Sequence, residues 1–77
     1  KIYVDYDVRA KTSTTTLYIG LYDLTLDKLV VTFTVSDVRT SGKTGSMYFY
    51  NLVQSHNYAV CFKAHPSALT GSAVIKH

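Results

Sequence analysis

Apolar and polar residues alternate along most of the chain, which is the pattern of strands with one buried face. The longest regular stretch covers residues 1–11, where Ile2, Val4, Tyr6, Val8 and Ala10 share one face. The same alternation, interrupted by turn residues, predicts six strands at residues 1–11, 15–23, 29–38, 46–51, 57–64 and 72–76. No helical period accompanies it, so the pattern indicates an all-β chain.

Polar and glycine-rich segments separate the predicted strands. The segment Thr-Ser-Gly-Lys-Thr-Gly at residues 40–45 is typical of a turn. Pro66 is expected to end the fifth strand, because proline is excluded from central strands. Gly71 is expected to form the turn before a short last strand. Six short strands with short connections predict a single domain over residues 1–77, an immunoglobulin-like Greek-key β-sandwich of about six to seven strands.

The inward positions of the alternation give the expected core. In the third strand, for example, Leu29 and Val35 are expected to point inward. The predicted core consists of Val4, Tyr6, Leu17, Ile19, Leu21, Val31, Phe33, Tyr58, Val60 and Phe62. The first strand, long and free of proline, leaves two alternatives: an ordinary strand paired within its own sheet, or an edge that inserts into or pairs with a neighbouring molecule.

Composition supports the all-β prediction and adds a question about stability. Glu and Trp are absent, while Tyr, Thr and Ser are abundant, and Tyr and Thr favour strands. A chain of 77 residues buries only a small core. Cys61 is the single cysteine, so no disulfide can form within the chain. Neighbouring subunits or domains are the expected source of additional stability.

The segment Leu-Val-Gln-Ser-His-Asn-Tyr-Ala-Val-Cys-Phe-Lys-Ala at residues 52–64 resembles the end of a fibronectin type III domain. That family has a Leu, a Tyr six residues later, and then alternating apolar residues, as Leu52, Tyr58, Val60 and Phe62 stand here. The resemblance implies that these four residues are structural, with the Tyr58 hydroxyl bonded back to nearby backbone. The chain departs from the family at Gln54, where Pro is usual.

A second resemblance leads to the same architecture. The run Gly-Ser-Met-Tyr-Phe-Tyr-Asn-Leu at residues 45–52, followed by Asn-Tyr-Ala-Val, resembles prealbumin-like sandwiches such as Cna B repeats and carboxypeptidase regulatory domains. Both resemblances imply a Greek-key sandwich used in adhesion, recognition or structural spacing. Neither implies catalytic residues.

Charge and hydropathy argue against several partner classes. The net charge of +3 is spread along the chain, so we expect no nucleic-acid binding. No apolar run approaches the roughly 20 residues that span a bilayer, so we expect no membrane insertion. Asp5 and Asp7 are interpreted as a solvated strand face. Cys61 with His56 or His65 suggests a nucleophile pair, but alternation directs Cys61 outward and supplies no orienting third group, so we expect no enzymatic activity. One Cys and three scattered His match no common ligand spacing, so we expect no cofactor or metal.

The aromatic surplus is the feature that bears most directly on function. The outward positions of the predicted strands provide a candidate interface formed by Tyr3, Tyr18, Tyr22, Val30, Tyr48 and Cys61. Clustered exposed aromatics indicate a partner surface, although tyrosine also suits strands with its hydroxyl in water. Cys61 is either a small packing residue or the site of an intermolecular disulfide.

Two functions remain open from the sequence. The favoured hypothesis is an extracellular structural or interaction module that self-assembles, through strand edges and Tyr-rich faces, into a filament or fibre. The alternative is a monomeric recognition or adhesion domain from a larger cell-surface or secreted protein. In both, the partner is a protein: another copy or a neighbouring domain.

Overall fold

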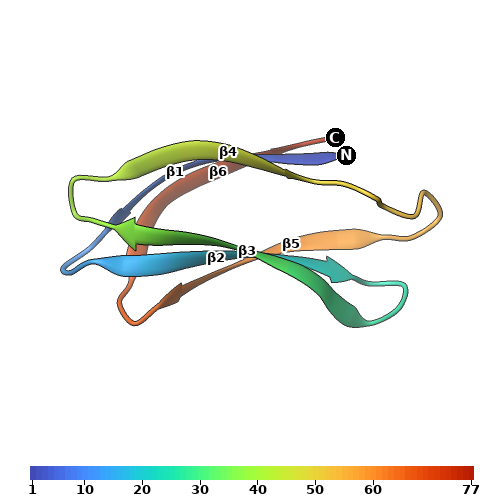
Figure 1. Cartoon of the computed structure of the whole chain (residues 1–77), viewed down its shortest axis with the longest axis horizontal. Coiled ribbons are helices and arrows are strands. Elements are labelled where there is room, and N and C mark those ends of the chain that lie inside the picture. The colour runs from blue at the N-terminus through green and yellow to red at the C-terminus, as the bar shows by residue number, and fades with distance from the viewer.

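The computed structural model describes all 77 residues and contains six β-strands and no helix. The strands are β1 (Ile2–Ala10), β2 (Thr15–Asp23), β3 (Lys28–Val38), β4 (Lys43–Phe49), β5 (Tyr58–His65) and β6 (Leu69–Lys76). They form two three-stranded antiparallel sheets, which lie as two layers in Figure 1. The predicted all-β fold is confirmed, and the arrangement is that of a small β-sandwich. No helix is available to cross a membrane.

The strand order is β4-β1-β6 in one sheet and β3-β2-β5 in the other. Only β2 and β3 follow each other within a sheet, and every other connection passes from one layer to the other. β1 is therefore a central strand, hydrogen-bonded to β4 on one side and β6 on the other. The alternative of an ordinary strand paired within its own sheet is confirmed, and the alternative of a free edge at β1 is wrong. The free edges belong to β3, β4, β5 and β6.

The core lies between the two central strands. It consists of Ile2, Val4, Val8, Leu17, Ile19, Leu21, Val35, Val38, Met47 and Phe49. Val4 and Ile19 are completely buried, which follows from their inward positions on β1 and β2. Phe49 points inward and Tyr48 outward, as strand alternation requires for adjacent residues. Tyr6, Tyr58 and Val60 pack against this cluster and are partly buried.

Three residues of the predicted core are exposed. Val31 is 46%, Phe33 38% and Phe62 45% exposed. The register pairs Ile19 with Phe33 on one side and with Phe62 on the other, so both phenylalanines lie on the inner side of the sheet. They belong to edge strands, however, and the opposite three-stranded sheet covers mainly the central strand. Alternation predicted their direction and could not predict how far the covering sheet extends.

The third strand departs from simple alternation at its beginning. Its register with β2 shifts between the pairs Leu21–Val31 and Tyr22–Leu29, which leaves Val30 as an extra residue in a β-bulge. The bulge reverses the direction of Leu29, which therefore lies on the outer face, 57% exposed. The expectation that Leu29 points inward is wrong for this reason.

Two predicted turns are parts of strands. β4 begins at Lys43, so Gly45 lies within the ladder, opposite Tyr6. The Tyr6 ring occupies the space that a side chain at Gly45 would need. β6 begins at Leu69 and contains Gly71, which has a φ of +141° and lies opposite Val8. A Cβ at Gly71 would collide with the backbone of β1, so this position requires glycine.

Candidate interaction surface

The outer face of the β3-β2-β5 sheet is hollowed at Gly20. Gly20 stands in the middle of the central strand, between Thr32 on β3 and Cys61 on β5. Because glycine has no side chain, the Cδ1 atom of Leu29 lies 3.1 Å from the position that a Cβ of residue 20 would occupy. Leu29 thus bends over the sheet and forms one wall of the depression.

The hollow has a volume of about 420 Å³. Its apolar lining comes from the Tyr18 ring, the Leu29 side chain and the exposed Cys61 side chain. Lys63 and His65 follow Cys61 at alternate positions of β5 and bound the hollow on that side. The result is an open, largely apolar depression with a basic border, a shape suited to an inserted side chain of another protein.

Tyr22 lies on the same face as Tyr18 but is held differently. Its hydroxyl donates a hydrogen bond to the Asp27 carboxylate in the β2–β3 turn. That hydrogen bond to a carboxylate, supported by partial desolvation, raises the pKa of Tyr22 above its ordinary value. Tyr22 is therefore fixed to its own turn, whereas the structure gives the Tyr18 hydroxyl no protein partner.

The six residues predicted as an interface fall on two separate surfaces. Tyr18, Tyr22 and Cys61 share the outer face of the β3-β2-β5 sheet. Val30 lies at the free edge of the same sheet, 49% exposed. Tyr3 and Tyr48 are cross-strand partners on the outer face of the other sheet. The candidate interface is thus not one patch.

The second surface is an aromatic cluster formed by Tyr3, Tyr48 and Tyr50. The ring centroids of Tyr3 and Tyr48 are 5.8 Å apart, and those of Tyr48 and Tyr50 are 5.9 Å apart. The Lys1 ammonium lies 4.9 Å from the centre of the Tyr48 ring, within the range of a cation–π contact. All three tyrosines are exposed, between 42% and 64%.

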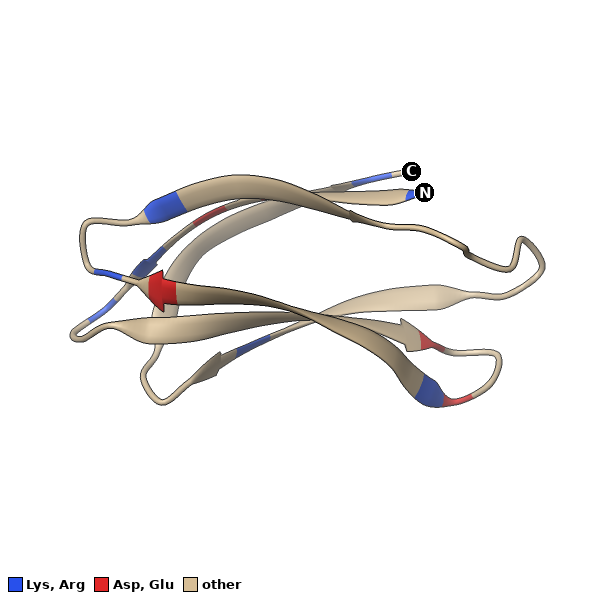
Figure 2. Cartoon of the chain, viewed as in Figure 1, with Lys and Arg blue, Asp and Glu red and all other residues tan.

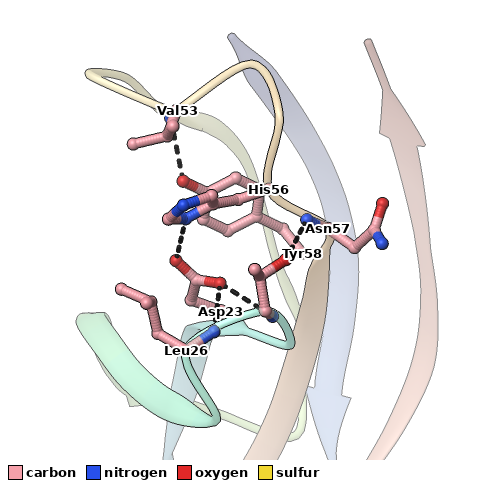
Figure 3. Close-up of polar contacts among 7 residues, drawn as sticks. Asp23, Leu26, Val53, His56, Asn57 and Tyr58 are labelled. Carbon is pink, nitrogen blue, oxygen red and sulfur yellow. Dashed lines mark hydrogen bonds and ion pairs between the residues drawn. The ribbon is translucent and has the colours of Figure 1, made fainter.

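A polar network closes the end of the sandwich where β2 and β5 meet the connection between β4 and β5 (Figure 3). Asp23 is buried, and one of its carboxylate oxygens accepts hydrogen bonds from the backbone N–H groups of Thr25 and Leu26. The other oxygen accepts a hydrogen bond from Nδ1 of His56 at 2.7 Å. The Tyr58 hydroxyl accepts a hydrogen bond from the Val53 N–H at 2.9 Å.

Opposing effects act on the pKa of Asp23. Burial disfavours the charged carboxylate and would raise the pKa. The hydrogen bonds from the Leu26 N–H, the His56 ring and the Thr25 N–H outweigh burial and lower the pKa below its usual value. Asp23 is consequently held as a carboxylate. Because each of its oxygens is occupied by a donor from the chain itself, the network anchors two connections of the fold.

Asp5 and Asp7 lie on the outer face of the β4-β1-β6 sheet. The Asp5 carboxylate accepts a hydrogen bond from Ser46 at 2.7 Å and pairs with the Lys76 ammonium at 3.4 Å. The Ser46 hydrogen bond, followed by that from Lys76, lowers the pKa of Asp5. The structure contains no group of three His, Cys, Asp or Glu residues arranged to hold a metal ion.

Three contributors to these surfaces were not predicted. Gly20 stands alone in an apolar strand, a signal for close approach of another group, and so was detectable from the sequence. Leu29 was not detectable, because its outward direction depends on the bulge at Val30. Tyr50 follows the last residue of β4 and extends the Tyr3–Tyr48 pair.

Searches of this chain against protein-family models, curated proteins and solved structures found no match.

Proposed function

We propose that this chain is a structural or interaction module that associates with protein, foremost with further copies of itself, in an extracellular or cell-surface setting. The observation that carries the proposal is the amount of apolar surface left uncovered. The exposed large hydrophobic residues outnumber the hydrophobic residues that are buried. Tyr18, Leu29 and Cys61 concentrate part of this surface in the Gly20 hollow.

The total accessible surface supports the same proposal. The chain exposes 5105 Å². A monomeric protein of 8.6 kDa is expected to expose about 4,700 Å². The additional area is consistent with a fold that covers part of its apolar surface with another molecule. Burying such surface contributes about 25 cal/mol per Å².

The finer fold assignment, an immunoglobulin-like sandwich related to fibronectin type III domains, belongs to the same proposal. It is supported by the spacing from Leu52 to Tyr58 and by the hydrogen bond that the Tyr58 hydroxyl accepts from Val53. Strands that pass repeatedly between two sheets also suit the assignment. Domains of this shape are used for adhesion and structural spacing.

The experiment is to measure the mass of the chain by size-exclusion chromatography with light scattering, and to image it by negative-stain electron microscopy. Assembly into dimers, oligomers or filaments supports the proposal, and a strictly monomeric chain at millimolar concentration contradicts self-association. The double variant Tyr18→Ser, Leu29→Ser tests the hollow, and Tyr3→Ser, Tyr48→Ser tests the aromatic cluster. Both pairs are at the surface, so folding is expected to survive, as circular dichroism can verify.

The second candidate is a monomeric recognition domain, and one observation favours it. The Gly20 hollow and the Tyr3–Tyr48–Tyr50 cluster lie on opposite outer faces, so a foreign protein would contact one of them without the other. A monomeric chain that binds a foreign protein, and loses that binding only in the Tyr18→Ser, Leu29→Ser variant, would establish this alternative.

A further inference from the structure

The free edge of β3 is the longest in the molecule and carries the most exposed apolar surface. β3 has 11 residues and hydrogen-bonds to β2 on one side only. Residues 28–34 are all exposed. Leu29, Val30, Val31 and Phe33 are between 38% and 57% exposed, with Leu29 on the outer face and Phe33 on the inner face. An edge that is apolar on both faces is a template for pairing with another strand.

The other free edges carry features that discourage pairing. β5 has Lys63 in its second half and is followed by Pro66. β6 contains Gly71, which offers no side chain for packing, and ends with Lys76. β4 is the shortest strand, with 7 residues, and begins with Lys43. In β3, by contrast, no charged residue, glycine or proline stands between Lys28 and Asp37, and Figure 2 shows this stretch without charge colour. The irregularities of β3, the bulge at Val30 and the positive φ of Asp37, lie outside its regular part.

The regular part of β3 is symmetric about Phe33. Its ladder with β2 is uninterrupted from Val31 to Val35 and is irregular on both sides of that stretch. A two-fold axis at Phe33 would place Thr32 opposite Thr34 of a second copy, and the irregular positions opposite each other. It would also place inner-face residues beside inner-face residues, as cross-strand pairing requires.

The end charges of β3 favour an antiparallel arrangement. Lys28 opens the strand and Asp37 stands near its end, as the blue and red segments of β3 show in Figure 2. The structure gives Lys28 no ion pair, whereas the exposed Asp37 carboxylate is already paired with the Arg39 guanidinium at 3.1 Å, so Lys28 of a second copy would join this pair. Antiparallel pairing brings Lys28 of each chain toward Asp37 of the other, whereas parallel pairing would bring like charges together.

We propose that two copies of this chain pair through β3, antiparallel about a two-fold axis at Phe33, to form a continuous six-stranded sheet. The inference rests on the proposed self-association and specifies its product. An isologous contact uses the same edge on both chains and leaves neither β3 free, so this contact produces a closed dimer and not a filament. The exposed Val31 and Phe33 side chains of both copies then form one apolar cluster across the axis.

The test uses two double variants that change the same two exposed residues. In Thr32→Lys, Thr34→Lys, each introduced lysine would face an introduced lysine of the other chain, and we expect dimerisation to weaken by at least about tenfold. In Thr32→Lys, Thr34→Glu, each introduced lysine would face an introduced glutamate of the other chain, and dimerisation is expected to persist. Dissociation constants come from sedimentation equilibrium, and circular dichroism checks folding of both variants.

The outcomes separate this inference from the proposed function. A wild-type dimer that survives in the Lys/Glu variant and dissociates in the Lys/Lys variant supports pairing at this register. Equal behaviour of the two variants, with a wild-type oligomer present, overturns the β3 pairing while self-association stands. A wild type that stays monomeric at millimolar concentration overturns both. Filaments that persist in the Lys/Lys variant also overturn the closed β3 dimer and assign assembly to another surface.

Discussion

The Tyr58 hydroxyl accepts a hydrogen bond from the backbone N–H of Val53, five residues earlier in the chain, at 2.9 Å (Figure 3). The bond ties the connection after β4 to the first residue of β5, while the Tyr58 ring packs against the core. We expect Tyr58→Phe to lower the free energy of unfolding by about 1 kcal/mol, because the ring remains and one hydrogen bond is lost. Urea denaturation measures the change.

Tyr50→Phe is the matched control for this prediction. Tyr50 lies in the same connection and is 64% exposed, and its hydroxyl has no hydrogen-bond partner in the chain. Its removal is expected to leave stability unchanged within about 0.5 kcal/mol. Equal losses in the two variants would show that the Val53–Tyr58 bond does not stabilise the fold.

The buried Asp23 carboxylate makes the free energy of unfolding depend on pH in the acid range. Burial opposes its charge, but the hydrogen bonds from Leu26, His56 and Thr25 keep its pKa below the usual value of 3.8. A carboxylate with a lower pKa in the folded chain binds fewer protons there than in the unfolded chain, so it stabilises the fold above the unfolded pKa. That contribution is lost as the pH falls below about 4 and through the folded pKa.

The measurement is the melting temperature between pH 2 and pH 6, taken for the wild type and for Asp23→Asn. We expect Asp23→Asn to melt lower than the wild type at pH 6 and to depend less on pH below about 4. Asp5→Asn is the comparison, because Asp5 also has a lowered pKa but lies exposed beside Ser46 and Lys76. An acid dependence that Asp5→Asn removes and Asp23→Asn leaves intact would refute the assignment to Asp23.

Two strand glycines are expected to respond to alanine with opposite signs. Gly20 lacks a positive φ, and its new methyl group would lie 3.1 Å from the exposed end of Leu29 and at ordinary contact distance from Thr32 and Cys61. Gly20→Ala is therefore expected to raise the free energy of unfolding by about 0.5 kcal/mol, through a less flexible unfolded chain. Gly71 has a φ of +141°, and a Cβ there would collide with the β1 backbone. Gly71→Ala is expected to cost at least about 2 kcal/mol.

Chemical denaturation of the two variants measures both changes in the free energy of unfolding, with their signs, in one experiment. If Gly20→Ala destabilises the chain, Leu29 cannot move aside and the hollow is a packed part of the fold. If Gly71→Ala is neutral, β6 does not require a positive φ at this position.

The sequence predicted well to which face of a strand each side chain points. It predicted poorly how the strands are ordered and how far one sheet covers the other. Alternation placed Val4, Ile19 and Leu21 correctly, because these residues lie on central strands with the other layer above them. It could not show that β1 is flanked on both sides, since strand order depends on contacts between distant segments. The resemblance carried by Leu52 and Tyr58 implied a structural tyrosine, and the Tyr58 hydroxyl accepts a hydrogen bond from Val53.

The candidate interaction surface shows the same difference between side-chain direction, which was predictable, and sheet arrangement, which was not. The sequence identified Tyr18 and Cys61 as outward-facing, because side chains alternate between the two faces of each strand. Tyr3 and Tyr48 lie on the outer face of the other sheet, and the sequence could not show this separation, because nothing local states which strands share a sheet. Leu29 was misplaced by one extra residue at Val30, since a bulge reverses every direction before it and leaves no mark in a run of apolar residues.

The opposite sheet covers two neighbours in the β2–β5 ladder to different extents. Ile19 on β2 and Phe62 on β5 are cross-strand partners on the same inner face, but Ile19 is 0% and Phe62 45% exposed. Ile19→Ala leaves a cavity in the core and is expected to cost about 2–5 kcal/mol. Phe62→Ala removes a larger ring that already lies half in water, so we expect only about 1–2 kcal/mol.

Urea denaturation of both alanine variants decides whether the edge strands are uncovered in solution. If both side chains were fully buried, Phe62→Ala would be expected to cost more than Ile19→Ala, because replacing a buried phenylalanine by alanine costs about 3–5 kcal/mol. A loss at Phe62 as large as that at Ile19 would mean that another part of the molecule, or a second copy, covers β5. Repeating the measurement over a range of protein concentrations separates these explanations, because only cover by a second copy makes the loss depend on concentration.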